Sequence, residues 1–187
     1  IKASKKAVYA WVAAILILIA LLLVISGCGA NNSTDDTTEA ISLNQVGEYS
    51  GAPYVYLNNN MPYFTDEEKE NTKPFENYSS LDDLGRCGVA FANIYKELMP
   101  TEERGPIGQI KPSGWHTVKY NGIIDGNYLY NCCHLICYQL TRENANELNL
   151  ITGTRYLDTE GMEGFENTVG DYVAEMENHV VWEDTKL

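Results

Sequence analysis

A run of 19 residues without a charged side chain, Val8 to Ser26, lies near the start of the chain. Three lysines precede it, at Lys2, Lys5 and Lys6. A basic head followed by an apolar stretch is typical of a segment that directs export or sits in a membrane. Because this run takes a large share of the apolar residues, the rest of the chain has to fold as a small, polar domain.

The apolar run ends in Ile25-Ser26-Gly27-Cys28, which resembles a bacterial lipobox, where the cysteine is lipidated after cleavage. About 20 apolar residues also span a bilayer, so a single transmembrane anchor is the alternative. We therefore expect residues 1–28 to be a lipoprotein signal peptide or membrane anchor, with a true start further upstream because no Met begins the sequence. Both alternatives place the remaining chain at the extracellular face of the bacterial cell membrane, since the lysine-rich head stays inside.

The net charge of −13 is unevenly distributed along the chain. Residues 31–84 contain 11 acids and 2 bases, and residues 157–187 contain 9 acids and 1 base. Residues 85–156 contain 6 acids and 7 bases. The overall charge argues against broad adhesion to nucleic acid or to an anionic membrane. A binding site for a polyanion should therefore lie within 85–156.

Downstream of Cys28 the sequence divides into three parts. Residues 29–42 are polar and aperiodic, which predicts a flexible tether. Residues 43–80 contain tyrosine-rich runs that indicate strands or extended segments, then a turn at Asn58–Asn60 and an acidic loop to about Ser80. Residues 81–187 form the main domain.

The main domain has the order strand, loop, strand, helix. A strand or short helix is expected within 89–98, a β-favouring stretch covers 127–140, and a second strand falls within 149–156. A helix follows, because apolar side chains recur there at helical spacing. These side chains are Phe165, Val169, Tyr172, Val173 and Met176.

Three neighbouring segments form one block: residues 131–140 (NCCHLICYQL), 143–147 (ENANE) and 149–156 (NLITGTRY). This block resembles the DNA/RNA non-specific endonuclease family, which includes bacterial competence nucleases and streptococcal secreted DNases. The similarity extends from about Leu81 to His179 and includes 84–86 (LGR) and 111–115 (KPSGW). It implies an α+β fold: a ββα-metal nuclease core with a small antiparallel sheet and flanking helices.

The resemblance also implies a site. His134 occupies the histidine position of the family's Asp/Asn-Arg-Gly/Cys-His motif and would be the general base, a role that suits a neutral imidazole. Asn149, Asp158 and Glu166 match the family's spacing of 9 and then 8 residues. Asp158 would hold one Mg²⁺, Glu166 would act through bound waters and Asn149 would orient the site. Outside this block, Asp158 would be interpreted as a helix cap and Glu166 as a solvated side chain.

The sequence departs from the family pattern at three positions. Cys132 stands where arginine is usual, Cys137 where glycine is usual, and Asp158 where asparagine is usual. Related sequences continue beyond the position of Leu187 into further strands, so we expect the domain to be short at its C-terminus. The alternative to an active nuclease is therefore a degenerate fold that binds nucleic acid or a surface partner without cutting.

Several cations and cysteines are further candidates. Arg155, Arg86 and Lys111 are the predicted substrate contacts, with Arg104, Lys119 and Arg142 as weaker candidates, whereas Trp115 and Tyr156 are interpreted as core residues. Cys87 and Cys133 could form a disulfide in an exported protein. A four-cysteine zinc site is disfavoured, because the adjacent Cys132 and Cys133 suit tetrahedral coordination poorly.

These features predict a membrane-tethered, Mg²⁺-dependent nuclease that cleaves DNA and RNA through backbone contacts. A nuclease toxin with an immunity protein as partner is a third hypothesis, which the lipobox disfavours.

Overall fold

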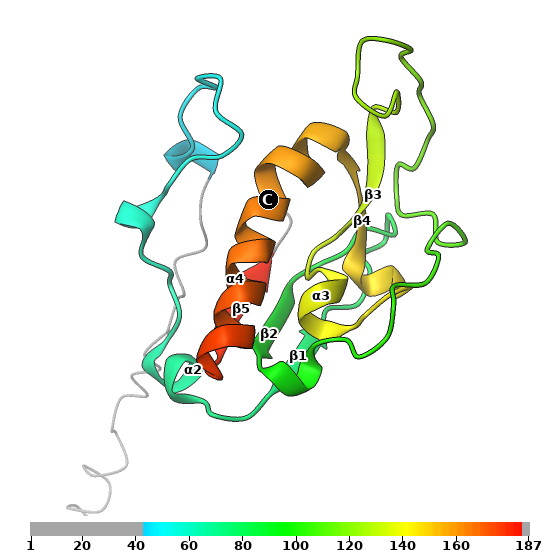
Figure 1. The fold of residues 1–187 in the computed structure, drawn as a ribbon. Helices are drawn as coiled ribbons and strands as arrows, with labels where there is room; N and C mark the ends of the chain where they lie inside the picture. The colour runs from blue at the N-terminus through cyan, green and yellow to red at the C-terminus, as the bar shows by residue number, and fades with distance from the viewer. Residues whose placement is uncertain (1–42, 185–187) are drawn as a thin grey trace, which may run out of the picture. The chain divides into compact units, whose positions relative to one another are not determined.

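The computed structural model describes residues 43–184 (Figure 1). They belong to the unit Thr38–Leu187. The predictions for residues 1–28 and 29–42, including lipidation of Cys28, lie outside the described residues. Within 43–184, no helix is long and apolar enough to cross a membrane.

The structure has short strands, short helices and several single helical turns. The strands are β1 Phe75–Tyr78, β2 Ala90–Ile94, β3 Tyr130–His134, β4 Leu150–Thr154 and β5 Val180–Asp184. The α-helices are α2 Asp66–Glu70, α3 Tyr138–Thr141 and α4 Glu163–Met176. The remaining turns are η1 Leu43–Gln45, η2 Asn58–Asn60, η3 Lys96–Leu98, η4 Glu147–Asn149 and the π-helical η5 Leu157–Met162.

Two antiparallel sheets organise these elements. The larger has the order β1-β2-β5, with Ala92 opposite both Glu76 on β1 and Trp182 on β5. The smaller pairs β3 with β4, so that His134 lies opposite Leu150 at one end. The chain then enters η5 and α4, which completes a β3-β4-α4 unit. This arrangement confirms the predicted α+β class.

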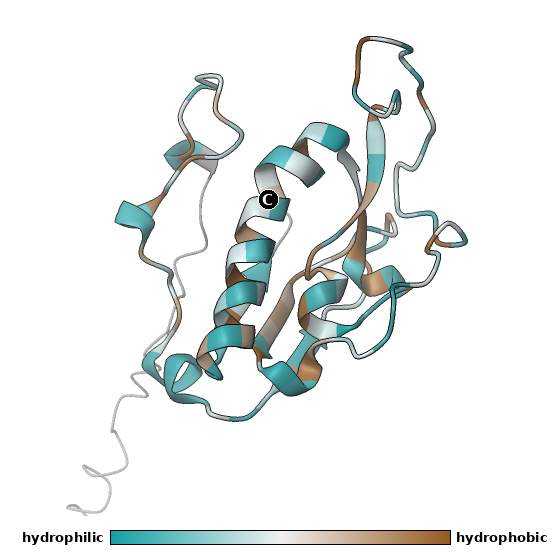
Figure 2. Ribbon diagram, viewed as in Figure 1, coloured by the Kyte–Doolittle hydropathy of each residue, from teal (hydrophilic) through white to brown (hydrophobic). Residues whose placement is uncertain are grey.

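The core lies between the larger sheet and the helices. Small side chains on β2, Ala90 and Ala92, are fully buried and let other elements approach closely. Figure 2 shows the hydrophobic colouring along β2 and the hydrophilic colouring on the outer turns of α4. The indole Nε1 of Trp182 donates a 3.3 Å hydrogen bond to the Leu135 carbonyl, which joins β5 to the segment after β3.

Helix α4 confirms the predicted helix but buries a different face. Val169 and Val173 pack into the core as expected, while Phe165 and Tyr172 are about 40% exposed. The buried face is completed by Gly170, where a side chain would meet Leu140 of α3. Apolar spacing alone did not distinguish this face, because the small glycine contributes no hydrophobic signal.

The region 43–80 differs in part from the prediction. Residues 43–64 contain no strand, which leaves the extended alternative, and Asn58–Asn60 forms the expected turn with positive φ angles. The expected acidic loop instead contains α2 and β1. Thr65 and Glu68 form a capping box that starts α2, and Phe75 of β1 packs 5.2 Å from the Phe91 ring.

The other uncertain segments now have definite structures. Within 89–98 the strand alternative holds, as β2, and a short turn follows it. The β-favouring stretch at 127–140 contains β3 but ends at His134, after which the chain turns into α3. His134 therefore lies at the end of a strand and not in its middle.

One glycine permits the close packing of the β3-β4 hairpin on η5. A Cβ added to Gly153 would lie 2.6 Å from the Cys133 Sγ and 3.2 Å from the Leu157 Cδ2. Both distances are shorter than ordinary van der Waals contact, and Cys133 is only 1% exposed. Any side chain at 153 would therefore push the strand away from the helix that follows it.

Gly153→Ala should lower the free energy of unfolding by about 1–3 kcal/mol, the usual cost of overpacking a well-filled site. Urea denaturation of the soluble fragment measures this change. Gly164→Ala is the matched control, because nothing lies within 4 Å of its added Cβ and alanine favours helix. Adding Cys133→Ala to Gly153→Ala should restore part of the loss. Wild-type stability in Gly153→Ala would contradict the close packing.

Candidate active site

A cleft of about 420 Å³ lies beside the β3-β4 hairpin and η5. Charged and polar groups reach it from three parts of the chain: Arg104 from the loop before β3, Asn131 and Cys132 from β3, and Asp158 from η5. The remaining wall is formed by Ile107, Trp115, Thr117, Tyr128 and Tyr130. A cation and a carboxylate therefore face the same open space.

His134 lies next to this cleft, 5% exposed, at the end of β3. Its Nε2 is 2.8 Å from the Asn144 carbonyl oxygen. Because a carbonyl can only accept, Nε2 must donate, and in the neutral ring the lone pair is on Nδ1. That Nδ1 lies 3.4 Å from a guanidinium nitrogen of Arg104.

The pKa of His134 is lowered from its usual value. Burial is the main cause, and the nearby Arg104 charge acts in the same direction, against the Asn144 hydrogen bond and the Asp158 charge, which raise it. Near neutral pH the imidazole is therefore neutral, with Nδ1 able to accept a proton.

Asn149 is fully buried and uses both ends of its amide within the protein. Its Oδ1 accepts from the Ile136 N–H and its Nδ2 donates to the Ile136 carbonyl, each at 2.9 Å. The Asn149 carbonyl also accepts from the Leu135 N–H. Asn149 thus extends the pairing of β3 with β4 past His134. Because Asn149 is fully buried and both atoms of its amide bond the backbone of Ile136, its geometry is that of a residue that positions His134.

Asp158 is held in the cleft by a 2.6 Å hydrogen bond from the Asn131 side-chain amide. Glu166 lies on the buried side of α4, where burial first and the Asp158 charge second raise its pKa to about 7. The charge of Asp158 therefore reaches Glu166. No group of three or more His, Cys, Asp or Glu side chains within 43–184 forms a ready-made metal cluster.

Cys132 lines the cleft as a neutral thiol, because burial raises its pKa. The charges of Lys111 and Arg104 act on this thiol in the opposite direction, so both cations lie nearby. Arg104 was only a weaker candidate in the sequence, where a loop arginine among turn residues gave no signal of its contact with His134.

The predicted substrate cations are distributed unequally. Lys111 lies 5.0 Å from the ring centre of Trp115, a cleft residue. Arg155 instead points its guanidinium to Asp125, at 3.3 Å, and packs against Gly126. Trp115, expected in the core, lines the cleft, and Tyr156 is 47% exposed. Both core expectations were wrong, because these rings sit outside the layer between the larger sheet and α4.

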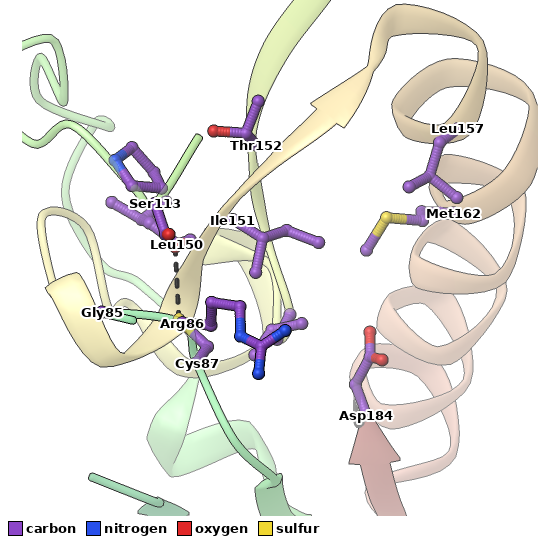
Figure 3. Close-up of a pocket in the computed structure, with 12 residues that line it drawn as sticks. Gly85, Arg86, Cys87, Ser113, Leu150, Ile151, Thr152, Leu157, Met162 and Asp184 are labelled. Atoms are coloured by element: carbon purple, nitrogen blue, oxygen red, sulfur yellow. Dashed lines mark hydrogen bonds between the residues drawn. The ribbon is translucent and has the colours of Figure 1, made fainter. Parts of the chain in front are cut away.

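Arg86 lies at a second pocket, of about 370 Å³, between β4, η5 and the end of β5 (Figure 3). There Leu157 and Met162 point toward Ile151, and Asp184 lies below them. Arg86 is held by a 2.7 Å ion pair with Asp82. Since Asp158 lines the first cleft and Leu157 lines this pocket, η5 contributes to both cavities. Arg86 lines only the second pocket, so the fold does not bring it together with the other predicted site residues.

The predicted Cys87–Cys133 disulfide is absent from the described part of the chain. The Cys87 Sγ lies 3.2 Å from the Leu150 carbonyl oxygen and 3.4 Å from that of Glu147. The Cys133 thiol instead packs against Gly153 and is reduced. The two cysteines therefore serve as small buried groups with different neighbours.

Comparison with known proteins identifies this arrangement. A sequence model described as DNA/RNA non-specific endonuclease matches residues 64–184, well over half of the chain. The chain belongs to the DNA/RNA non-specific endonuclease family. The match begins ahead of α2 and β1, so this endonuclease domain includes elements before residue 81. A search of curated proteins found no significant match.

Solved structures support the same fold. The endonuclease resembles NucA from Streptococcus agalactiae with a magnesium ion bound, at 21% identity and a TM-score of 0.60, over 75% of this chain and 69% of that one. The metal-free NucA structure gives 21% identity and a TM-score of 0.62, over 85% and 75%. Sda1 nuclease with a bound zinc ion gives 24% and 0.50, over 64% and 67%.

Proposed function

We propose that this endonuclease hydrolyses phosphodiester bonds of DNA and RNA with His134 as the general base and one divalent metal ion held at Asp158. The observation that carries the proposal is the proximity of three unlike groups: the Arg104 guanidinium and the Asp158 carboxylate line one cleft, and the Nδ1 of the neutral His134 imidazole lies beside it, 3.4 Å from Arg104. Hydrolysis of a phosphodiester needs a base, a cation for the phosphate and a metal ligand.

His134 supplies the base. Its Nδ1 takes a proton from a water molecule, whose oxygen then attacks phosphorus, and the bond from phosphorus to the leaving oxygen breaks. The leaving oxygen takes a proton from solvent water. Because Asn144 holds Nε2, the ring cannot turn away from this orientation without losing a hydrogen bond. The low pKa keeps the base unprotonated at neutral pH.

The donor groups at Asp158 suit a hard divalent cation. Asp158 offers carboxylate oxygens and is oriented by Asn131. Glu166 adds a second carboxylate, which lies close enough to Asp158 for the Asp158 charge to raise the pKa of Glu166. A set of oxygen donors fits Mg²⁺ better than Zn²⁺, which prefers nitrogen and sulfur. When bound, the ion supplies positive charge against the charge that develops on the phosphate and the leaving oxygen. Glu166 would hold waters of that ion.

Arg104 supplies a fixed cation in place of the arginine that the family usually has at position 132. Its guanidinium lies beside His134 Nδ1, so a phosphate bound by Arg104 would lie next to the base. Cys132 carries no charge, and a second cation, Lys111, also acts on its thiol. This arrangement favours an active enzyme in which the phosphate contact has moved from strand β3 to the preceding loop.

A protein that binds nucleic acid without cutting it is the second candidate. It is favoured by one observation, the neutral thiol of Cys132 at the arginine position. Mg²⁺-dependent digestion of plasmid DNA and of RNA distinguishes the two, because a binding protein would shift the mobility of both substrates and leave them intact.

The proposed location is the outer face of the bacterial membrane, with the domain tethered through Cys28 or through the apolar run. This location follows from the sequence of residues 1–28. It would give the enzyme access to extracellular nucleic acid.

His134→Ala should lower cleavage by about 10²–10⁴-fold, the usual contribution of a general base. Plasmid digestion with Mg²⁺, repeated in EDTA, measures the rate and its metal dependence. His179→Ala is the control, because that ring stacks on Tyr95 and not in the cleft. Equal rates for wild type and His134→Ala, both free of host nuclease, would exclude His134 as the base.

Arg104→Gln should lower cleavage by roughly ten- to a hundredfold, because a charge-assisted contact is typically worth about 1.5–3 kcal/mol. Arg86→Gln should have a much smaller effect, since that side chain is paired with Asp82. Cys132→Arg, added to Arg104→Gln, should restore part of the rate by returning a cation to the strand. A larger loss from Arg86→Gln than from Arg104→Gln would contradict this assignment.

If Cys28 is lipidated, cells fed a labelled fatty acid should yield a labelled membrane protein, and Cys28→Ser should lose the label. Persistent labelling of Cys28→Ser would refute lipidation at this residue. An unlabelled membrane product that retains its N-terminal segment would favour the transmembrane anchor.

A further inference from the structure

One wall of the cleft carries aromatic rings that the core does not use. Trp115, Tyr128 and Tyr130 all line this wall, and none of them belongs to the buried core cluster. Tyr128 is 45% exposed. Single exposed aromatic side chains are common on protein surfaces, but here several gather at one cleft, next to Asp158.

Two of these rings are each accompanied by a lysine. The Lys111 ammonium lies 5.0 Å from the centre of the Trp115 ring, and the Lys119 ammonium lies 5.3 Å from that of Tyr128. The Tyr130 ring packs instead against the His116 ring, with the ring centres 4.2 Å apart. The two lysine contacts hold their rings in place and put positive charge at the same surface.

The charge of this segment is opposite to that of the whole chain. Residues 104–134 contain three bases, Arg104, Lys111 and Lys119, and one acid, Asp125. That acid is itself paired with Arg155. In a protein with a net charge of −13, this wall therefore repels a polyanion less than the acidic segments 31–84 and 157–187 do.

We propose that this wall binds unpaired nucleic acid, with bases stacked on Trp115 and Tyr128 and phosphates held by Lys111 and Lys119. Aromatic platforms beside a cationic track are the way proteins bind single strands without reading sequence. A duplex keeps its bases stacked on one another, so the rings add little to its binding. The enzyme should thus favour single-stranded DNA and RNA over duplex. This inference rests on the proposed function, because it concerns the substrate of the same cleft.

Binding can be separated from cleavage by working in a His134→Ala background with EDTA. Fluorescence anisotropy then gives the affinity of the full chain for a labelled oligothymidylate and for a labelled hairpin duplex. Trp115→Leu and Tyr128→Leu should each weaken binding of the single strand by roughly ten- to a hundredfold. The affinity for the duplex should stay unchanged within error.

Trp115→Phe and Tyr128→Phe keep a ring at each position and should retain most of the affinity for the single strand, which separates stacking from misfolding. Tyr172→Leu, an exposed tyrosine on α4, is the control and should change neither affinity. Equal weakening for single strand and duplex, or no weakening, would overturn the proposal while leaving the nuclease assignment intact. Failure of the parent chain to cleave either substrate with Mg²⁺ would instead overturn the proposed function.

Discussion

The buried amide of Asn149 holds the site together. It pairs with both backbone groups of Ile136, two residues after His134, at the point where β3 leaves the hairpin. A backbone segment that turns inward would otherwise leave a buried N–H and a buried C=O unpaired, at about 1–3 kcal/mol. With the amide in place, the chain can end its strand at His134 and turn directly into α3. The direction of the imidazole therefore depends on a residue that never reaches the cleft.

The sequence predicted site residues where a residue type suited to the chemistry also stood in a recognisable sequence pattern. His134 stands at the histidine position of a motif that the chain resembles, and Asn149, Asp158 and Glu166 stand at the family's separations of 9 and 8 residues. A strand, strand, helix order was visible from β-favouring and helical spacing. Arg104 could not be found in this way, since nothing along the loop indicates which arginine folds back onto His134. The buried face of α4 was also missed, because Gly170 gives no hydrophobic signal although it packs against α3. The Cys87–Cys133 pairing failed for a related reason: the number of cysteines does not say which thiols meet, and here the Cys87 thiol faces the Leu150 carbonyl while the Cys133 thiol packs on Gly153.

The distribution of charge links the fold to the proposed chemistry. Along the sequence, acidic segments lie on both sides of residues 85–156, where bases slightly outnumber acids. Arg104 of this stretch lines the cleft, so it brings positive charge to the site where a polyanion would bind. In the proposed mechanism Arg104 supplies the positive charge that the neutral thiol of Cys132 lacks, and its guanidinium lies 3.4 Å from His134 Nδ1. A side chain on a loop can adjust to its ligand more easily than one on a paired strand.

The π-helical turn η5 affects how distances along this chain should be interpreted. Asp158 and Glu166 are eight residues apart, which in a regular α-helix would leave them about 80° out of phase at roughly 100° per residue. A π turn accommodates one additional residue. The eight residues from Asp158 to Glu166 therefore cover the same rotation as seven residues of a regular α-helix. The two carboxylates are therefore separated by about two whole turns. A helix without the bulge and one residue shorter would present the same pair on the same face, and spacing patterns counted in residues would overlook it.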